Sequence, residues 1–289
     1  MCPVLKSGGR ACDVSCYRPV SVLCALSRVF ELILADRLEY EFSKHLSQYQ
    51  HGFVTKRSTV TNLMLTSHTI ANSLSRQLQH DIFYADFSKA FDKMDHVLLI
   101  NKLHSYDISS YLIELITSYL SNRKSFVQFN GQQSSQYTLT SGIPQGSTLG
   151  PLLFKIVIND LPNSIKYSTC QMFADDVKLG HEISCIEDCI KLQEDMNMLY
   201  EWSLKNKLYL NRDKCHIMSF SRKKSLLIFH YTIDHTQVVR AERVKDLGVI
   251  FDQKLTFSLH IQVLQCNTYS QVHLRPHMSE GLVQQLCEV

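Results

Sequence analysis

Two adjacent carboxylates, Asp175 and Asp176, stand between a mainly apolar run at residues 170–174 and Val177. Acids side by side repel each other and cost stability, so a structural role alone explains them poorly. The pair suggests a divalent metal site at the tip of a hydrophobic hairpin. An acid doublet on an exposed turn is the alternative that these two residues leave open by themselves.

A third acid, Asp86, follows an apolar stretch at residues 81–85 that predicts a short buried strand. Such a strand fixes the residue at its end rigidly at the rim of the core, which is a frequent place for chemistry. Strand-end placement would let Asp86 converge with the acid doublet. Carboxylates arranged in this way suit a divalent metal ion that prefers oxygen ligands.

Two further stretches could contact a ligand. Residues 141–151 contain three glycines and two prolines, and their backbone amides suit a nucleotide or a template. Lys214 lies between two predicted short strands at residues 209–211 and 215–220. It is either a functional side chain or a solvated lysine.

The remaining pattern predicts the elements that must position these groups. Apolar residues recur at helical spacing over residues 20–38, with Arg28, Glu31 and Asp36 largely on the other side. The other predicted elements are helices at 98–120, 152–161 and 186–202, a hairpin at 123–137, and a strand at 244–251. The tail from residue 266 to residue 289 has no clear periodicity.

A helix start is predicted at Ser58 or Thr59, either of which can cap it. Lys56 and Arg57 precede that start, and they either bring positive charge to a site or form a solvated loop.

Composition sets limits on the function. The chain has 289 residues, 45% hydrophobic and 20% charged, with a net charge of +3, so nucleic acid binding would need a local basic groove. The ten cysteines lack the spacing of a disulfide framework or a zinc site, which favours a reducing compartment. No stretch approaches the roughly 20 apolar residues that span a bilayer. We expect an intracellular protein of the nucleus or cytoplasm, without a membrane partner.

The order of these features resembles the palm of reverse transcriptases: an acid at a strand end, a Gly/Pro/Gln loop, an acid doublet in a hairpin, and a later lysine. The sequence motifs are similar to those of the polymerase of non-LTR retrotransposons, jockey-like or related, over about residues 6–260. The stretches that carry the resemblance are residues 17–21, 50–53, 86–96, 118–123, 141–151, 159–162, 173–176 and 247–248. Several independent stretches in one order weigh far more than any single motif.

The resemblance implies an α+β right-hand polymerase fold, with partial fingers at residues 1–80 and a palm that carries the catalytic motifs at 81–250. Residues 251–289 would form a degenerate or partial thumb, so the thumb is expected to be truncated or absent. The implied activity is RNA-directed DNA polymerase, which extends a DNA primer on an RNA template with deoxynucleoside triphosphates by two-metal phosphoryl transfer.

The resemblance also implies roles for the acids and the lysine. Asp86 and Asp175 would bind two Mg²⁺ ions, or Mn²⁺ in their place, and Asp176 would be a weaker or indirect ligand. Lys214 resembles a lysine proposed to protonate the pyrophosphate leaving group. Asp92 lies in the same stretch as Asp86 but reads more simply as a turn or helix-start acid.

Substrate contacts are implied as well. Arg18 resembles a residue that binds the triphosphate, and Lys6 is a weaker candidate for a second phosphate contact. Phe91 resembles the aromatic gate that excludes a ribose 2′ hydroxyl, with core packing as its alternative role. Gln145 and Gly146 resemble the residues that pack against the incoming nucleotide and template.

Three hypotheses follow from the sequence. The first is an active reverse transcriptase, and the second is a catalytically inert retroelement remnant that binds nucleic acid. The third is an RNA-dependent RNA polymerase, against which Phe91 and Ala174 argue. Oligomeric state and template preference are left open by the sequence.

Overall fold

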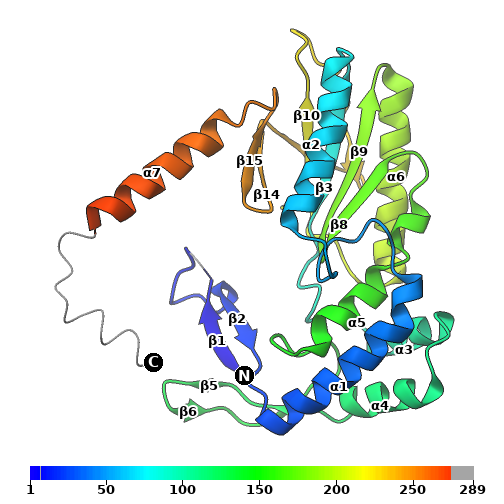
Figure 1. Cartoon of the computed structure of the whole chain (residues 1–289), viewed down its shortest axis with the longest axis vertical. Coiled ribbons are helices and arrows are strands. Elements are labelled where there is room, and N and C mark those ends of the chain that lie inside the picture. The colour runs from blue at the N-terminus through cyan, green and yellow to red at the C-terminus, as the bar shows by residue number, and fades with distance from the viewer. Residues whose placement is uncertain (7, 275–289) are drawn as a thin grey trace.

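The structure is a computed structural model that describes residues 1–6 and 8–274. Its largest sheet has five strands in the order β13-β10-β3-β9-β8, and Figure 1 shows helices around it. The strands of this sheet are β3 (Gln79–Ala85), β8 (Thr169–Phe173), β9 (Asp176–Ile183), β10 (His216–Phe220) and β13 (Val239–Ala241).

The helices are α1 (Ala25–Phe42), α2 (Thr59–Ser75), α3 (His96–Ser105), α4 (Ser110–Leu120), α5 (Leu149–Ile158), α6 (Ile186–Lys205) and α7 (Ser258–Leu274), with short 3₁₀ turns η1 (Val14–Cys16), η2 (Ser43–His45) and η3 (Leu161–Ser164). The smaller hairpins pair β1 (Cys2–Leu5) with β2 (Tyr17–Val20), β4 (Lys124–Ser125) with β7 (Tyr137–Thr138), β5 (Gln128–Phe129) with β6 (Gln132–Gln133), β11 (Thr232–Ile233) with β12 (Thr236–Gln237), and β14 (Arg243–Asp246) with β15 (Val249–Asp252).

The central strand β3 is buried along its whole length because both faces of the sheet are covered. Its side chains alternate between the two faces, as the pleat requires. Phe83 and Ala85 belong to the large hydrophobic cluster that includes residues of α5 and α6. Ile82 and Tyr84 belong to a second cluster, with residues of α2, β10 and the β14–β15 hairpin. The strand predicted at residues 81–85 is thus confirmed and is two residues longer.

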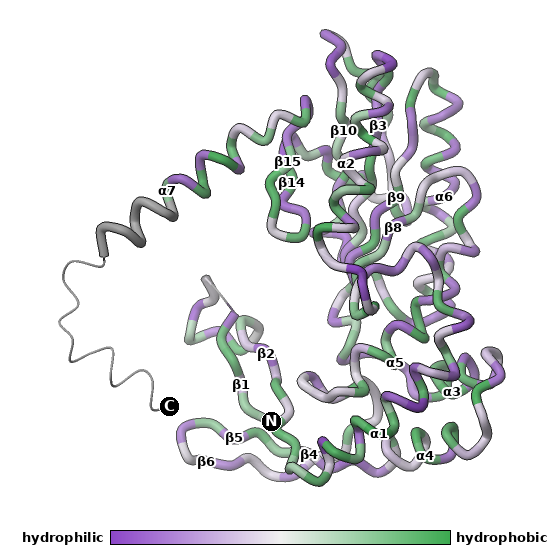
Figure 2. The backbone as a smooth tube through the Cα atoms, in the orientation of Figure 1, coloured by the Kyte–Doolittle hydropathy of each residue, from purple (hydrophilic) through white to green (hydrophobic). Residues whose placement is uncertain are grey.

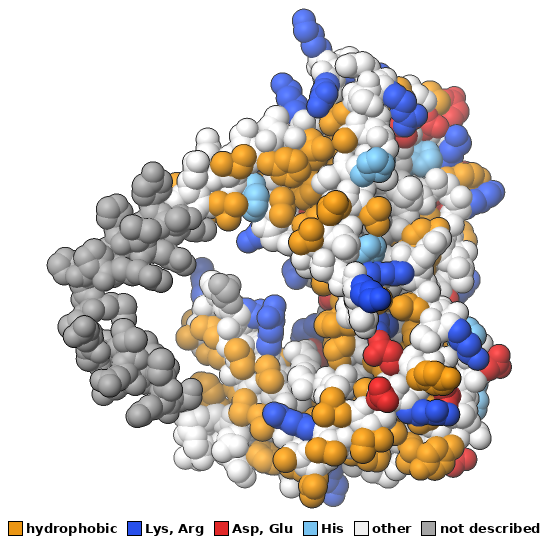
Figure 3. All heavy atoms as spheres, viewed as in Figure 1, with side chains coloured by type: hydrophobic (Ala, Val, Ile, Leu, Met, Phe, Trp, Pro, Cys, Tyr) orange, Lys and Arg blue, Asp and Glu red, His pale blue; other side chains and the backbone are white. Residues whose placement is uncertain are grey.

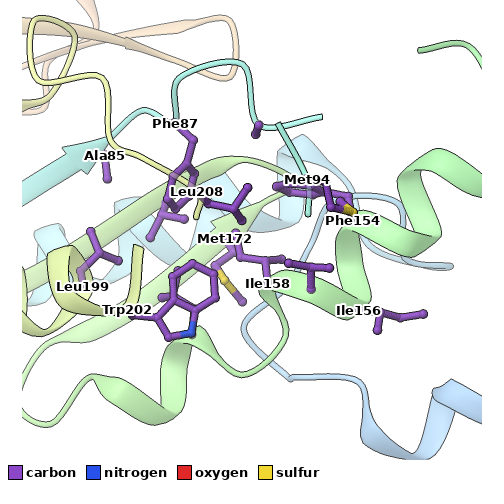
Figure 4. Packing of buried hydrophobic residues seen from close by; sticks show 14 of the residues in the cluster. Ala85, Phe87, Met94, Phe154, Ile156, Ile158, Met172, Leu199, Trp202 and Leu208 are labelled. Carbon is purple, nitrogen blue, oxygen red and sulfur yellow. The ribbon is translucent and has the colours of Figure 1, made fainter. Parts of the chain in front are cut away.

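Helix α5 lies inside the core, because every one of its residues except Pro151 is buried. A helix that is apolar on all sides needs partners on all sides. Figure 4 shows Phe154, Ile156 and Ile158 among the side chains of this cluster, with Ile158 beside Met172 of β8. The helix begins at Leu149, three residues before the predicted start at residue 152.

Polar residues at the C-terminal end of α5 connect distant segments. The Asn159 side chain accepts the N–H of Ser47 at 2.7 Å and donates to the carbonyl of His45 at 2.8 Å. The carboxylate of Asp160 accepts from Lys102 Nζ at 2.6 Å and from Trp202 Nε1 at 3.1 Å. The stretch at residues 159–162 therefore joins η2, α3 and α6 around the core.

The prediction for residues 20–38 was wrong in its bounds and in the face that is buried. Residues 17–20 pair with β1, so α1 begins only at Ala25. Its buried residues are Glu31, Leu34, Leu38 and Phe42, whereas Glu31 was expected on the polar side. Glu31 tolerates burial because its carboxylate accepts from the Tyr119 hydroxyl and, at 2.7 Å, from the N–H of Thr148.

Part of the apolar surface of α1 faces solvent. Hydrophobic and hydrophilic residues mix along the helix in Figure 2, and Figure 3 shows hydrophobic side chains over α1 at the lower edge of that view. The exposed ones include Leu26, Val29, Phe30 and Ile33, together with Leu32 and Tyr40. The first four are among the residues that set the helical spacing in the sequence, yet they lie outside the core.

Two other expectations need correction. Residues 98–120 form two helices, because the chain turns at Asp107, which has a φ of +53°. Residues 244–251 form the β14–β15 hairpin rather than one strand, since Leu247 and Gly248 have φ values of +44° and +95°. The stretch from residue 266, which has no clear periodicity in the sequence, continues a helix as far as Leu274 that projects away from the sheet (Figure 1). Residues 275–289 lie outside the described residues.

The other predicted elements are confirmed except the short strand at residues 209–211, where Leu210 makes an isolated bridge to Phe87. The strand predicted at 215–220 is β10, which begins at His216. Helix α6 occupies the stretch predicted at residues 186–202, and the hairpin predicted at 123–137 turns at Asn130 and Gly131. Ser58 caps α2 by accepting the N–H of Thr61. Arg57 is not a solvated loop residue, because its guanidinium donates to three backbone carbonyls.

A buried ion pair joins the sheet to the β14–β15 hairpin. Lys178 of β9 and Asp246 of β14 are 2.6 Å apart, with side chains 3% and 5% exposed. Lys178 also donates to Asn62 and Thr66 of α2. Burial lowers the pKa of Lys178, and the Asp246 carboxylate opposes that shift.

We expect Lys178→Met to lower the free energy of unfolding by about 3–5 kcal/mol, because it leaves Asp246 charged and buried without its partner. Lys178→Met combined with Asp246→Leu should recover most of that loss. The control is Lys191→Met, which removes a surface lysine from its pair with Asp188 and should lower stability far less. Urea denaturation monitored by circular dichroism measures all three, and equal losses in the Lys178 and Lys191 variants would contradict the prediction.

Candidate active site

The three acids predicted as a group lie where neighbouring strands of the central sheet begin or end. The antiparallel register pairs Ala85 with Val177, so Asp86, the residue after β3, adjoins the start of β9. The β8–β9 hairpin pairs Phe173 with Asp176 and leaves Ala174 and Asp175 as its two-residue turn. The hairpin that the sequence predicted for the acid doublet is therefore confirmed, and strand pairing brings Asp86 beside it.

The position of Asp86 is fixed by the segment that leads to Lys214. The carbonyl of Asp86 accepts the N–H of Asn211 at 2.7 Å, and Phe87 pairs with Leu210. The N–H of Lys214 in turn donates to the carbonyl of Asn211, so one turn positions both the acid and the lysine. Lys214 Nζ lies 3.6 Å from Asp86 Oδ2.

The electrostatic environment of the doublet disfavours its charged form. Burial raises the pKa of Asp175, and the Asp86 carboxylate raises it further, while Lys214 and Arg18 lower it. The pKa of Asp176 is raised to about 6 by desolvation and by Asp175, Asp246 and Asp86. A bound cation would stabilise the charged form of carboxylates whose pKa values are raised in this way.

The donor set fits a hard divalent cation. Asp86 Oδ2 is buried and accepts no hydrogen bond from the described residues, with the Lys214 ammonium as its ion-pair partner at 3.6 Å. A carboxylate oxygen with this free acceptor capacity, beside two other carboxylates, suits a metal ligand. Within residues 1–6 and 8–274 no group of three or more His, Cys, Asp and Glu side chains is close enough to hold an ion alone. Mg²⁺ commonly takes only one or two protein carboxylates and completes its shell with substrate phosphates and water.

A cleft of about 350 Å³ adjoins these acids. Asp86, Asp176 and Lys214 line it together with residues that the sequence reading missed, namely Lys178, His216 and Asp246. A charged residue inside an otherwise apolar strand was the available signal for Lys178, since Val177 and Leu179 flank it. For the other two, only the folded chain shows their nearness to the acids.

Gln145 is held by Asp92. Gln145 Nε2 donates to Asp92 Oδ1 at 2.7 Å, and the Gln145 carbonyl accepts the N–H of Ser21 at 2.8 Å. Asp92 lies in a turn, in agreement with the simpler reading of that acid, and orients a residue of the glycine-rich loop. Gly142 permits this arrangement, because a Cβ atom there would lie 2.4 Å from the Asp92 carbonyl oxygen. Gly146, next to Gln145, has a φ of +91°.

The other predicted substrate residues lie around this loop and on the β1–β2 hairpin. Phe91 is half-buried and stacks on Phe154, with ring centroids 4.6 Å apart. Arg18 of β2 is exposed and near enough to influence the pKa of Asp175. Lys6 follows β1 and is exposed, so both basic residues lie on the hairpin that Figure 1 shows apart from the sheet.

Comparison with known families identifies the family to which the chain belongs. Residues 4–251 match the family described as "Reverse transcriptase (RNA-dependent DNA polymerase)". The chain belongs to the reverse transcriptase family. The resemblance noted in the sequence is confirmed, and the α+β fold is that of reverse transcriptase fingers and palm.

Similar proteins include polymerases of mobile elements. The chain is 30% identical to the RNA-directed DNA polymerase from mobile element jockey of Drosophila funebris, over 91% of this chain and 30% of that protein. It is 28% identical to the probable RNA-directed DNA polymerase from transposon X-element of Drosophila melanogaster, over 92% of this chain and 30% of that protein. The chain thus spans about three tenths of the length of these curated relatives.

Among solved structures, the reverse transcriptase fold is shared with apo telomerase from Candida tropicalis truncated from its C-terminal domain. That comparison has a TM-score of 0.52 and 14% identity, and it covers 81% of this chain and 44% of the telomerase. Within the described part of the chain, no helix has the length and apolar character needed to cross a membrane.

The raised pKa of Asp176 predicts a pH-dependent loss of folding stability in the metal-free chain. Asp176→Asn should raise the free energy of unfolding at pH 7 by on the order of 1 kcal/mol, allowing for solvent screening at this exposed side chain. Because the pKa rises from 3.8 to about 6 on folding, the wild type loses this stability as pH rises through that window. The gain in the variant should vanish below about pH 4.

Urea denaturation in EDTA between pH 4 and pH 8 measures this difference. Asp36→Asn, on the exposed side of α1, serves as the control and should show no such pH dependence. A gain from Asp176→Asn that persists at pH 4 would refute an electrostatic origin.

Proposed function

We propose that this chain is an RNA-directed DNA polymerase that extends a DNA primer on an RNA template with deoxynucleoside triphosphates. The observation that carries the proposal is the convergence of Asp86, Asp175 and Asp176 at one sheet edge in a member of the reverse transcriptase family. Phosphoryl transfer needs little covalent chemistry from the protein, and it depends on positioning and on neutralising charge.

The three carboxylates would hold two Mg²⁺ ions, or Mn²⁺ in their place, and Asp176 would be the weaker or indirect ligand. Bound metal ions would neutralise the charge that develops on the transferred phosphoryl group. Arg18 would bind the triphosphate, since its guanidinium fork matches phosphate oxygens. Lys214 Nζ would donate a proton to the leaving pyrophosphate, and its place 3.6 Å from Asp86 supports that role.

Phe91, Gln145 and Gly146 would form the nucleotide side of the site. Gln145 would pack against the incoming base and template, with Asp92 fixing its amide. Phe91 would exclude a ribose 2′ hydroxyl, and its stacking on Phe154 gives the ring a rigid support. The packing role and the gate role of Phe91 are compatible.

We also propose the division into fingers at residues 1–80, palm at 81–250 and a partial thumb from 251 onward. The acids, Lys214 and the five-stranded sheet all fall in the proposed palm. The nine described cysteines are free, which suits action inside the cell, in nucleus or cytoplasm.

The activity test uses the purified chain, a DNA primer on an RNA template, and Mg²⁺. We expect extension with deoxynucleotides, and Asp175→Ala should lower its rate by roughly a thousandfold, because metal coordination supplies several kcal/mol of transition-state stabilisation. The matched control is Asp36→Ala, which removes an acid from the exposed side of α1 and should keep wild-type activity.

Other outcomes would favour the competing hypotheses. Template binding in a gel-shift assay without extension by either nucleotide type would support an inert remnant that binds nucleic acid. Preferential incorporation of ribonucleotides would support an RNA-dependent RNA polymerase and overturn the proposal.

A second test concerns sugar selection. Phe91→Ala should reduce the preference for deoxynucleotides over ribonucleotides by about tenfold or more, as expected when a steric contact of one small group is lost. The quantity measured is the ratio of kcat/KM for dCTP to kcat/KM for CTP, so any loss of folded protein cancels. An unchanged ratio would leave Phe91 with packing as its role.

A further inference from the structure

Gln50 is buried against the turn that carries the acid doublet, 124 residues away in the sequence. Its side chain is 1% exposed. Gln50 Oε1 accepts the N–H of Ala174 at 3.0 Å and the N–H of Gly52 at 2.7 Å, and Gln50 Nε2 lies 3.5 Å from the Ala174 carbonyl oxygen. One side-chain amide thus contacts both backbone polar groups of the residue directly before Asp175.

Ala174 has a backbone conformation that its own side chain disfavours. Its φ is +55°, in the left-handed region where a Cβ atom approaches the following carbonyl oxygen. In a two-residue hairpin turn, a positive φ at the first central residue is normally supplied by glycine. Conformations of this kind persist only where surrounding contacts hold them. The contacts from Gln50 are placed to do so.

The loop that carries Gln50 is fixed to β8 on both sides of that residue. The N–H of His51 donates to the carbonyl of Met172 at 2.9 Å, and the N–H of Met172 donates to the carbonyl of Tyr49 at 3.0 Å. Asn62 Nδ2 also donates to the Met172 carbonyl, at 3.3 Å. The loop is therefore anchored at Met172, which pairs with Val177, the residue after the acid doublet.

Arg57 and Gly52 complete the arrangement. Arg57 Nη1 donates to the carbonyls of residues 47, 48 and 50 at 3.1, 3.0 and 2.5 Å, which fixes the backbone of the loop. A Cβ atom on Gly52 would lie 2.2 Å from the backbone nitrogen of Ala174, so a larger residue would push the turn away. The close approach of loop and turn requires glycine at this position.

We propose that Gln50 is a positioning residue for the catalytic acids. Its amide holds Ala174 in the left-handed conformation and so sets the direction of the Asp175 and Asp176 carboxylates. The catalytic consequence rests on the proposed polymerase function, whereas the effect on the turn and on metal affinity does not. A turn released from this clamp would relax, and its carboxylates would converge less well on one cation.

The test compares Gln50→Leu with Gln48→Leu, a control at an exposed glutamine of the same loop. For Gln50→Leu we expect kcat for primer extension and affinity for Mn²⁺, measured by electron paramagnetic resonance, each to fall by about tenfold, the effect of one or two lost hydrogen bonds. KM for deoxynucleotides should stay within about twofold, because no substrate contact is removed. Amide hydrogen exchange in a peptide that covers residues 173–177 should accelerate, and Gln48→Leu should match the wild type in all measurements.

Ala174→Gly provides the diagnostic rescue. Glycine adopts a positive φ without steric cost, so in the Gln50→Leu background it should restore Mn²⁺ affinity and kcat by several fold. Gln50→Asn is the second variant if Gln50→Leu does not fold. It keeps a neutral amide that is one methylene shorter and cannot reach Ala174 in the same way, so it should accelerate the exchange of residues 173–177 and lower Mn²⁺ affinity in the same direction.

The outcomes separate this inference from the proposed function. If the wild type extends no primer, the polymerase proposal fails, and Mn²⁺ affinity and amide exchange still test the clamp. If Gln50→Leu is folded and leaves the exchange of residues 173–177 and Mn²⁺ affinity unchanged, the clamp is refuted. Failure of Ala174→Gly to restore Mn²⁺ affinity in that background would also overturn it.

Discussion

The structure depends on holding three carboxylates together at one end of the central sheet, against their mutual repulsion. Antiparallel pairing of β3 with β9, and of β9 with β8, places Asp86 beside the doublet, and β3 is buried along its whole length. The raised pKa values of Asp175 and Asp176 are the electrostatic consequence. This mutual repulsion costs stability in the metal-free chain, and the cation site proposed above would offset that cost.

Several polar side chains join distant segments of the chain through hydrogen bonds to the backbone. Gln50 contacts the buried backbone of Ala174 in the turn of the acid doublet, and Asn159 contacts the partly buried backbone of His45 and Ser47. A buried peptide group left unpaired costs more than the hydrogen bond contributes, so such residues are hard to replace. The motifs therefore serve architecture as well as chemistry.

The interpretation of α1 shows where periodicity fails as a guide. Helical spacing of apolar residues was real, but the core took Glu31, Leu34, Leu38 and Phe42, and left Phe30 and its apolar neighbours exposed. A sequence pattern reports that a helix has an apolar face, and it does not report which face has a partner. Glu31 could be buried only because a hydroxyl and an amide from remote segments satisfy it.

The sequence by itself determined the family, the strands that end in acids, and the candidate residues Asp86, Asp175, Asp176, Lys214, Phe91 and Gln145, because these depend on residue type and local order. Local pattern also predicted the Ser58 cap and the turn at Gly131. Only the tertiary structure decided that Asp92 holds Gln145, that Lys178 pairs with Asp246, and that Gln50 contacts the turn that carries the acid doublet. Those contacts join residues that are 53 to 124 positions apart in the sequence. Strand pairing and packing across the sheet bring such distant residues into contact.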